Sequence, residues 1–535
     1  MPFLTRRLIQ NFKQTSILQN ISSAYPSTRV KRIPQTVQVN DQEIKISRHT
    51  AFLRNVLEND LNFVKLLREQ KNFSTNDWLN ARDELLKISI VNEKNIDAII
   101  SNLCFGFENI DAFMSYMKYL KSNNYEINLY LKGTYASKLA LKQILTKSDM
   151  QEIYDIYDSL LKQYSVLDGT TCDRLIQALC VTERWEESAK LFEMLTISTK
   201  KPSKAISRIV KAAFDNNKPE TGWKYFIQAA ESEIHLLAQA FASYLEYCLR
   251  IFKDKGLLEK NLLKMFEICR DKEVLINKEE LDNYLTIFQS LGYTYFDTFM
   301  NIDGECMHCS HQLPKVVITQ EQFNELSELF MKNVVVGDNL YTNTTPIEFK
   351  KFLQFLKNAL PYDIVIDGLN VALSQQNKTI PAKVEILSKA IEYFVNRNQK
   401  VILLGRKHML KWNNMGYIKH NTKMFLFDNS SFDDPHLIYA TFYGGLNTCF
   451  LSGDLMRQHK SLLPKNMQKL FKLWQLSHQY LKNQTNAINY PVKFESIPHE
   501  DKNGWHMPYF TGNSSVPKDS YNATSNWICL RKKCQ

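Results

Sequence analysis

The stretch that decides the fold of the C-terminal half is Asp363-Ile-Val-Ile-Asp-Gly-Leu-Asn-Val-Ala-Leu373. A short apolar run that stops in a glycine turn is typical of a strand buried on both faces. Three later runs have the same form, at residues 400–405, 423–428 and 449–454. Helical patterns accompany them at residues 383–396, 435–443 and 456–461. The alternation predicts an α/β domain with a parallel sheet.

Aspartates follow these predicted strands. Asp367 follows the first, Asp433 and Asp434 precede the helix after the third, and Asp454 follows the fourth. In an open α/β sheet the ligand site lies beyond the carboxyl ends of the strands, so the four acids can converge there. Clustered carboxylates repel one another unless a cation lies between them. Oxygen ligands suit Mg²⁺, and one ion or a pair about 4 Å apart activates water for attack on a phosphodiester.

This pattern predicts a metallonuclease, but each aspartate can also serve only as a helix cap or a turn residue. Asp433, for example, is a plausible N-cap for a helix that begins at Pro435. Basic residues near the same strand ends are candidate phosphate contacts: Arg406, Lys407, Arg457 and His459. The alternative for each is a solvated surface charge, or a structural role for the histidine.

A second candidate site begins with Cys306-Met-His-Cys309. The chain has no second CxxC, so the remaining ligands of a metal site must come from distant segments. Candidates near the C-terminus are His506, Cys529 and Cys534, and His308 and His311 are rival histidines. A Cys₃His zinc site would join the segment before the α/β domain to the segment after it. The alternative is a redox CxxC.

Residues from about 48 to 290 have a helical pattern with few prolines. Segments 146–163, 181–198 and 216–233 align at a spacing of 35 residues, and a helix is expected before each, at residues 135–145, 171–180 and 205–214. Such helix pairs bury their apolar faces by stacking on their neighbours. Residues 170–195, TTCDRLIQALCVTERWEESAKLFEML, resemble a pentatricopeptide repeat, which commonly binds RNA. A related protein-binding helical repeat of about 34 residues fits the period equally well.

The composition is that of an ordinary globular chain, with 535 residues and a formal net charge of +11. The basic surplus favours an anionic partner, and no apolar run approaches the length of about 18 residues that a membrane span requires. The first forty residues contain six basic residues and no acid. Their amphipathic pattern predicts a mitochondrial presequence, and a disordered basic arm is the alternative. We therefore expect reduced thiols or metal ligands rather than disulfides.

Several motifs together resemble the protein-only ribonuclease P family, particularly its animal mitochondrial branch. They are DIVIDGLNVAL (363–373), GRKHML (405–410), FDDPHLIYATF (432–442), GDLMRQHK (453–460), GWHMPYF (504–510) and NWICL (526–530). The resemblance implies a pentatricopeptide-repeat superhelix and a PIN-like (NYN) α/β metallonuclease domain, joined by a split zinc-binding region. With the residue patterns above, it predicts 131–292 for the repeats, 316–489 for the nuclease, and 293–315 with 490–535 for the zinc region. Residues 1–45 are expected to form the presequence or a disordered arm, and residues 46–130, which match no motif of the family, a helical extension.

The same resemblance implies roles for individual residues. Asp367, Asp433, Asp434 and Asp454 match the catalytic acids that bind Mg²⁺, with Mn²⁺ as a substitute. Cys306, Cys309, His506 and Cys529 match the ligands of a structural zinc, which leaves Cys534 spare.

The implied reaction is hydrolytic removal of 5′ leaders from precursor tRNA in the mitochondrial matrix. The implied partners are a tRNA methyltransferase of the m1-purine-9 type and a short-chain dehydrogenase. Two alternatives stay open: a PIN-like ribonuclease with another RNA substrate, and a non-catalytic RNA-binding scaffold.

Overall fold

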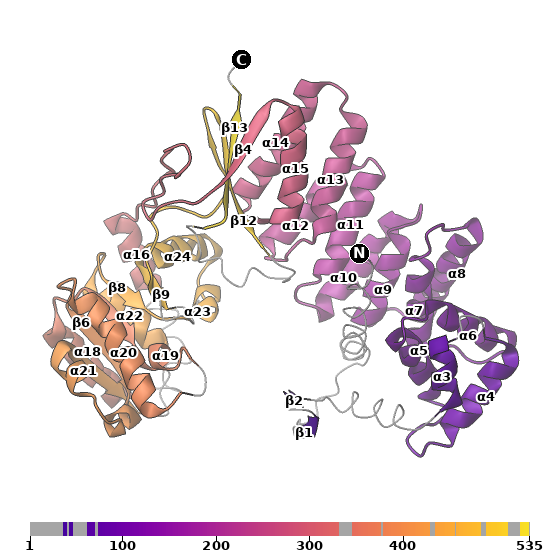
Figure 1. Ribbon diagram of the computed structural model, residues 1–535, viewed down its shortest axis with the longest axis horizontal. Helices are drawn as coiled ribbons and strands as arrows, with labels where there is room; N and C mark the ends of the chain where they lie inside the picture. Colours follow the sequence, from indigo (N-terminus) through magenta and orange to yellow (C-terminus); the bar gives the residue numbers. More distant parts are fainter. Residues whose placement is uncertain are drawn as a thin grey trace, which may run out of the picture. The chain divides into compact units, whose positions relative to one another are not determined.

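The computed structural model describes residues 36–39, 42–45, 61–69, 73–330, 345–375, 378–428, 434–454, 456–482, 488–511 and 525–533. The chain divides into two compact units, residues 1–253 and 254–535. Figure 1 labels the helices and strands of both units. Within the predicted presequence, β1 (Thr36–Val39) pairs antiparallel with β2 (Gln42–Lys45). Residues 1–35, which carry its basic groups, lie outside the described residues.

The first unit is built of α-helices. The helical extension contains α3 (Asn62–Glu69), α4 (Thr75–Leu86), α5 (Ile96–Gly106) and α6 (Ile110–Ser122). The helices of the repeats follow: α7 (Leu129–Leu139), α8 (Lys147–Gln163), α9 (Gly169–Leu179), α10 (Ser188–Ser198), α11 (Ser203–Asp215), α12 (Pro219–Glu231) and α13 (Ala238–Ile251). The short 3₁₀ helix η1 (Trp185–Glu187) leads into α10.

The predicted helix pairs are confirmed. Helix α7 packs on α8 and α9, α9 packs on α10 and α11, and α11 packs on α12 and α13. Two of the positions that repeat every 35 residues face the core in the first two pairs, where Tyr157 and Phe192, and likewise Leu160 and Leu195, are buried. Stacking thus supplies the core that a single pair cannot form.

One helix boundary was predicted wrongly. The first helix of the first pair was expected at residues 135–145, whereas α7 spans Leu129–Leu139 and residues 140–146 form a turn. Asn128 begins the helix, since its side chain accepts a hydrogen bond from the backbone N–H of Leu131 at 2.9 Å. This N-cap satisfies one of the free N–H groups at the start of a helix.

The second unit begins with α14 (Lys255–Asp271), β3 (Ile276–Asn277) and α15 (Lys278–Ser290). They accompany a sheet with the strand order β11-β12-β13-β4, made of β4 (Tyr293–Thr298), β11 (His499–Asp501), β12 (Gly504–Phe510) and β13 (Trp527–Lys532). The antiparallel pairing of β13 with β4 joins segments more than 200 residues apart in the chain. These segments belong to the two halves of the split region that the sequence predicts.

A six-stranded sheet forms the α/β domain, in the order β10-β9-β8-β5-β6-β7. The predicted strands are β5 (Ile364–Asp367), β6 (Val401–Arg406), β7 (Thr422–Phe427) and β8 (Cys449–Leu451), and their pairing is parallel as expected. Three further elements had no predicted counterpart: α24 (Lys465–His478), the parallel strand β9 (Gln479–Lys482) and the antiparallel edge strand β10 (Ile488–Asn489).

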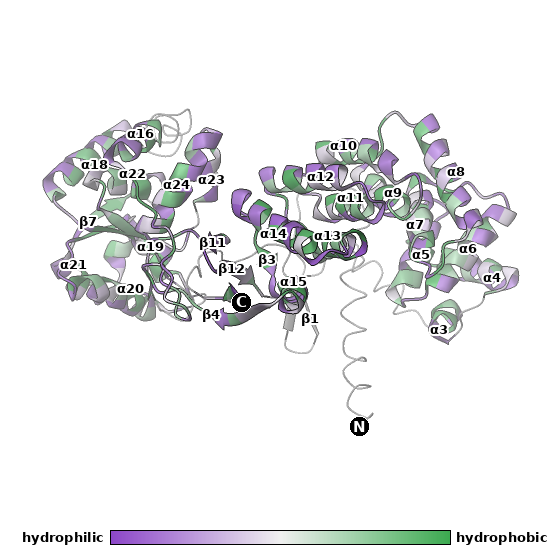
Figure 2. Cartoon of the chain, turned by 90° about the horizontal axis from the view of Figure 1, so that it is seen from above, coloured by the Kyte–Doolittle hydropathy of each residue, from purple (hydrophilic) through white to green (hydrophobic). Residues whose placement is uncertain are grey.

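Helices cover both faces of this sheet (Figure 2). One layer contains α16 (Gln320–Phe330), α18 (Pro346–Ala359), α22 (Asp434–Gly444) and α24, which share a core with Val365 of β5. The other contains α19 (Gly368–Ala372), α20 (Ile380–Val395) and α21 (Gly416–Asn421), which share a core with Ile364 and Ile366. Successive residues of β5 therefore enter different cores, which explains why the whole strand is apolar.

The predicted fold class, a helical repeat array with an α/β domain, is confirmed. Among the described residues, no helix combines the length and the apolar character needed to span a bilayer.

The close contact between α19 and β6 gives a first prediction. A Cβ on Gly368 would lie 2.8 Å from the carbonyl oxygen of Leu404, whereas a Cβ on Gly416 would meet nothing within 4 Å. We expect Gly368→Ala to lower the free energy of unfolding by about 1–3 kcal/mol, because overpacking against backbone forces a shift. Gly416→Ala, the control, should be neutral or stabilising by up to about 1 kcal/mol. Urea denaturation of both variants measures this, and equal stabilities would contradict the packing.

Candidate active site and metal centre

Asp367 is the last residue of β5 and is almost fully buried, with 5% of its surface exposed. Its Oδ1 accepts a hydrogen bond from the backbone N–H of Asn370 at 3.0 Å, so the side chain caps α19. Its Oδ2 accepts one from the hydroxyl of Ser452 at 3.4 Å. The carboxylate therefore has a fixed orientation at the carboxyl end of the central strand.

Asp454 lies in the loop after β8, the strand that neighbours β5. Its backbone N–H donates to Oγ of Ser452 at 3.2 Å, and its Oδ1 accepts from the N–H of Met456 at 3.0 Å. Ser452 is thus a bridge between Asp367 and Asp454. The structure brings these two predicted acids together where the strand order reverses, since the chain leaves β5 for β6 on one side and returns through β8 on the other.

Two further side chains, for which no role was predicted from the sequence, form hydrogen bonds with the Asp454 loop. Asn370 accepts a hydrogen bond from the N–H of Gly453 at 2.7 Å. Gln479, at the start of β9, donates to the carbonyls of Ser452 and Asp454, each at 2.8 Å. Its own Oε1 accepts from Gln475 at 2.7 Å, which fixes the amide orientation. No residue pattern marks Gln479, because its role depends on β9 pairing with β8.

The other two predicted acids are less fully described. Asp434 is the first residue of α22, and nothing is described of its side chain. The helix follows β7 and packs on β5 and β8, so its N-terminus lies at the carboxyl edge of the sheet. Asp433 lies outside the described residues.

The predicted phosphate contacts lie at the same edge. Arg406 ends β6 and Lys407 follows it, while Arg457 and His459 belong to α23 (Arg457–Ser461), after the Asp454 loop. Lys407 forms an ion pair with Asp428 at 2.5 Å, and this contact raises the pKa of the lysine. Burial lowers the pKa of His459, although the charge of Asp454 opposes the shift. Of these four residues, Lys407 and Arg457 are exposed to solvent, and Arg406 and His459 are partly buried.

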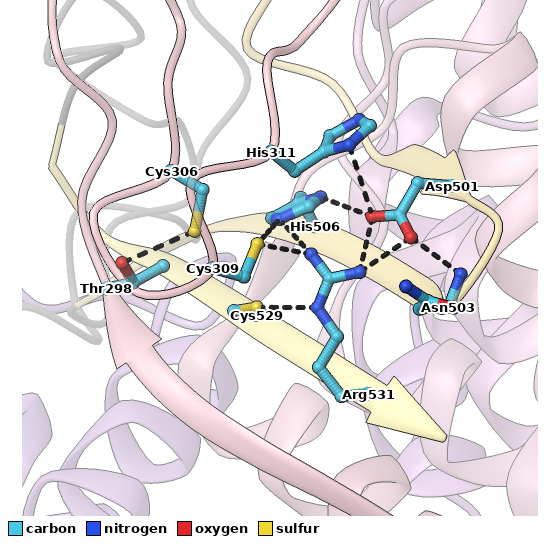
Figure 3. A network of polar contacts seen from close by, with 9 residues as sticks. All are labelled: Thr298, Cys306, Cys309, His311, Asp501, Asn503, His506, Cys529 and Arg531. Atoms are coloured by element: carbon cyan, nitrogen blue, oxygen red, sulfur yellow. Dashed lines mark hydrogen bonds and ion pairs between the residues drawn. The ribbon is translucent and has the colours of Figure 1, made fainter. Parts of the chain in front are cut away.

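The predicted zinc ligands also come together in the structure. Cys306 and Cys309 lie in the loop after β4, His506 lies on β12, and Cys529 is its cross-strand partner on β13. One ligand atom of each lies within 4.8 Å of the others (Figure 3). The Sγ of Cys309 is 3.3 Å from Nε2 of His506, and hydrogen bonding to Cys529 lowers the pKa of the Cys306 thiol.

This geometry decides between the candidates that the sequence left open. The ring of His308 stacks on Phe296, outside the Cys₃His group, and Cys534 lies outside the described residues. His311 belongs to a second group, with Asp501 and His506. Residues 307–309 form a turn with no helix after Cys309, which disfavours the redox alternative. Three sulfurs and one imidazole nitrogen can hold a metal ion.

The comparisons with known proteins agree with this arrangement. The model of the family described as Protein-only RNase P matches residues 300–529. The chain is 26% identical over 458 residues to the mitochondrial ribonuclease P catalytic subunit of Rattus norvegicus, a match that covers 82% of this chain and 75% of the relative. It is 23% identical over 251 residues to Proteinaceous RNase P 3 of Arabidopsis thaliana, which covers 43% of this chain and 41% of the relative.

Among solved structures, nuclear proteinaceous RNase P 2 from A. thaliana aligns with a TM-score of 0.49 and 15% identity, over 83% of this chain and 100% of that chain. The family model covers both the carboxyl edge of the parallel sheet and the Cys–His cluster. The region of this chain that carries both sites is therefore similar to the protein-only ribonuclease P family.

Proposed function

We propose that this chain is an endoribonuclease, a ribonuclease P that removes 5′ leaders from precursor tRNA. The observation that carries the proposal is the pair Asp367 and Asp454, bridged by Ser452 at the reversal of strand order in the α/β domain. The names of the relatives support the reaction. A binding scaffold would have little use for carboxylates held in fixed positions at one edge of the sheet.

The cofactor we propose for this edge is Mg²⁺, as one ion or two, with Mn²⁺ as a substitute. Asp367, Asp433, Asp434 and Asp454 would hold it, because carboxylate oxygens suit a hard cation. When bound, such an ion supplies an activated water and stabilises charge on the phosphodiester oxygens.

The protein's own contribution is orientation. The hydroxyl of Ser452 and the N–H of Asn370 aim the carboxylate of Asp367, while Gln479 fixes the main chain on either side of Gly453. Oxygen ligands whose positions are already fixed need not move during the reaction. Preorganised sites lower the activation barrier in this way. We propose that Arg406, Lys407, Arg457 and His459 contact the phosphates of the substrate.

For the Cys–His cluster we propose a structural zinc ion bound by Cys306, Cys309, His506 and Cys529. A closed Cys₃His set is typical of structural zinc. The ion would pin the CxxC loop to β12 and β13 and would hold together the segments on either side of the α/β domain. Structural zinc contributes on the order of 10 kcal/mol in peptides.

The helix pairs of the first unit are the proposed binding site for the tRNA body, by resemblance to pentatricopeptide repeats. We further propose that the protein acts in the mitochondrial matrix with a tRNA methyltransferase of the m1-purine-9 type and a short-chain dehydrogenase. The mitochondrial names of the rodent relatives support the compartment.

Removing one acid tests the reaction. Asp367→Asn, Asp434→Asn and Asp454→Asn should each reduce cleavage of a precursor tRNA by at least about 100-fold, the scale of losing a preorganised electrostatic contact. Binding of the tRNA should survive. The matched control is Asp363→Asn, because Asp363 lies at the opposite end of β5, where it accepts from the N–H of Lys400 at 2.7 Å.

The cleavage assay uses the chain alone and with the two partner proteins. Product ends are mapped on a panel of RNAs with and without tRNA folds. Unchanged cleavage by the three variants would reject the acids as catalytic. Cleavage only of the RNAs that lack a tRNA fold would indicate a ribonuclease with another substrate. Binding of tRNA without cleavage would indicate a scaffold.

Gln479 gives a second test of the site. Gln479→Leu removes both bonds to the Asp454 loop, so we expect a fall in kcat of about 10-fold or more and a higher Mg²⁺ requirement, the usual scale for residues behind metal ligands. The control Gln468→Leu removes a bond to the carbonyl of Leu463, outside this loop. Equal kinetics for the two variants would show that the loop holds its shape without Gln479.

Metal analysis tests the Cys–His cluster. The purified protein should contain one equivalent of zinc, and a chelator that removes it should lower the melting temperature. Cys306→Ser should abolish the zinc content, while Cys449→Ser, at a cysteine outside the cluster, should retain it. Zinc retention by both variants would place the metal elsewhere.

A further inference from the structure

A layer of charged side chains lies behind the Cys–His cluster (Figure 3). Its centre is Asp501, at the end of β11, whose side chain is 6% exposed. Arg531 on β13 donates to both carboxylate oxygens of Asp501, at 2.6 and 2.5 Å. The backbone N–H of Asn503 donates a third hydrogen bond at 2.7 Å. The carboxylate is therefore fixed independently of the cluster.

The two ring nitrogens of His506 face different neighbours. Nε2 lies 3.3 Å from the sulfur of Cys309 and 2.7 Å from Nη2 of Arg531. A guanidinium can only donate, so the contact with Arg531 requires a lone pair on Nε2. The neutral ring then carries its proton on Nδ1.

That Nδ1 proton has one charged acceptor near it. The ring of His506 is fully buried, and Nδ1 has no hydrogen-bond partner of good geometry among the described residues. Oδ2 of Asp501 lies 3.4 Å away, within ion-pair distance. Leaving a buried N–H without an acceptor is costly, so a small turn of the ring toward Asp501 is favoured.

Arg531 extends this layer to the sulfurs. Its Nε donates to Sγ of Cys529 at 3.1 Å, and its Nη2 donates to Sγ of Cys309 at 2.5 Å. A cation beside thiolates offsets part of their charge. A metal binds through the same Nε2 lone pair that faces Arg531, so Arg531 must lose its contact with Nε2 when the metal binds. Its two hydrogen bonds to Asp501 would keep the guanidinium in place.

We propose that Asp501 is a positioning residue for the metal centre. Its carboxylate accepts a hydrogen bond from the Nδ1–H group of His506 and holds Arg531 by two further hydrogen bonds. The Nε2 atom of His506 is thereby left as the metal ligand. Carboxylates of this kind raise ligand basicity and fix the ring, and their loss typically costs about 10–100-fold in metal affinity. The inference rests on the proposed metal site, and it adds a residue that lies outside the four ligands.

The first experiment measures zinc release into a chromogenic chelator from the full-length protein. Asp501→Asn, which keeps the shape of the side chain and removes its charge, should release zinc about 10–100-fold faster than the wild type. The matched control is Asp303→Asn, since Asp303 pairs with Lys493 at 2.8 Å in the same part of the unit. That variant should release zinc at the wild-type rate.

A double-mutant cycle separates positioning of His506 from general support of the sheet. In a His506→Cys background the fourth ligand is a sulfur, which has no second nitrogen to orient. In that background Asp501→Asn should change the rate of zinc release by less than about 3-fold. The remaining change would come from the lost hydrogen bonds between Asp501 and Arg531. The same fold-change in both backgrounds would overturn the proposal.

A measurement on the wild type needs no variant. Nitrogen-15 NMR of labelled histidines should show His506 with its proton on Nδ1 and the metal on Nε2, and the reverse assignment would overturn the proposal. Wild-type protein without any bound metal would instead refute the proposed zinc site. A metal-loaded wild type whose release rate Asp501→Asn leaves unchanged would refute this inference alone.

Discussion

The parallel pairing of β5 with both β6 and β8 is the constraint on which the candidate active site depends. Asp367 ends β5, and β8 stops at Leu451, level with Ile366. The next residue, Ser452, can therefore reach across to Asp367 while it receives the N–H of Asp454. Neighbouring strands lie about 4.8 Å apart. If a third strand lay between β5 and β8, Ser452 would be too far from Asp367 to bridge it to Asp454.

A second long-range pairing supports the metal centre. Strand β4 and strand β13 meet although more than 200 residues separate them, so closing this loop carries an entropic cost. The Cys–His cluster lies beside that junction, with two cysteines after β4 and one on β13. A metal bound there would offset the cost at the place where it arises. The ion pairs of Glu273 with Lys469 and Lys472 add a smaller tie between α24 and the end of α14.

Much of the α/β domain could be predicted because its signals are local. The strands around Ile366 and Leu403 are apolar along their whole length, since both faces are covered, and Gly368 marks the turn where β5 ends. By contrast, β9 reads Gln-Tyr-Leu-Lys, and no apolar pattern marks it. Its two buried residues are the polar Gln479 and Lys482. The predicted start of α7 was also wrong. The helix begins earlier in the chain, where Asn128 caps it.

The sequence by itself determined which groups are available for chemistry: the acids that follow the strands, the CxxC with candidate cysteine and histidine partners far along the chain, and the period of the helix pairs. These features depend on residue type and spacing, which the chain order records directly. Only the tertiary structure showed that His506, and neither His308 nor His311, lies with the three cysteines. It also showed that Ser452 and Gln479 hold Asp367 and the Asp454 loop, and that Asp501 lies beside His506. Those roles arise from contacts between strands and loops that are distant in sequence, and such contacts exist only once the sheets have formed.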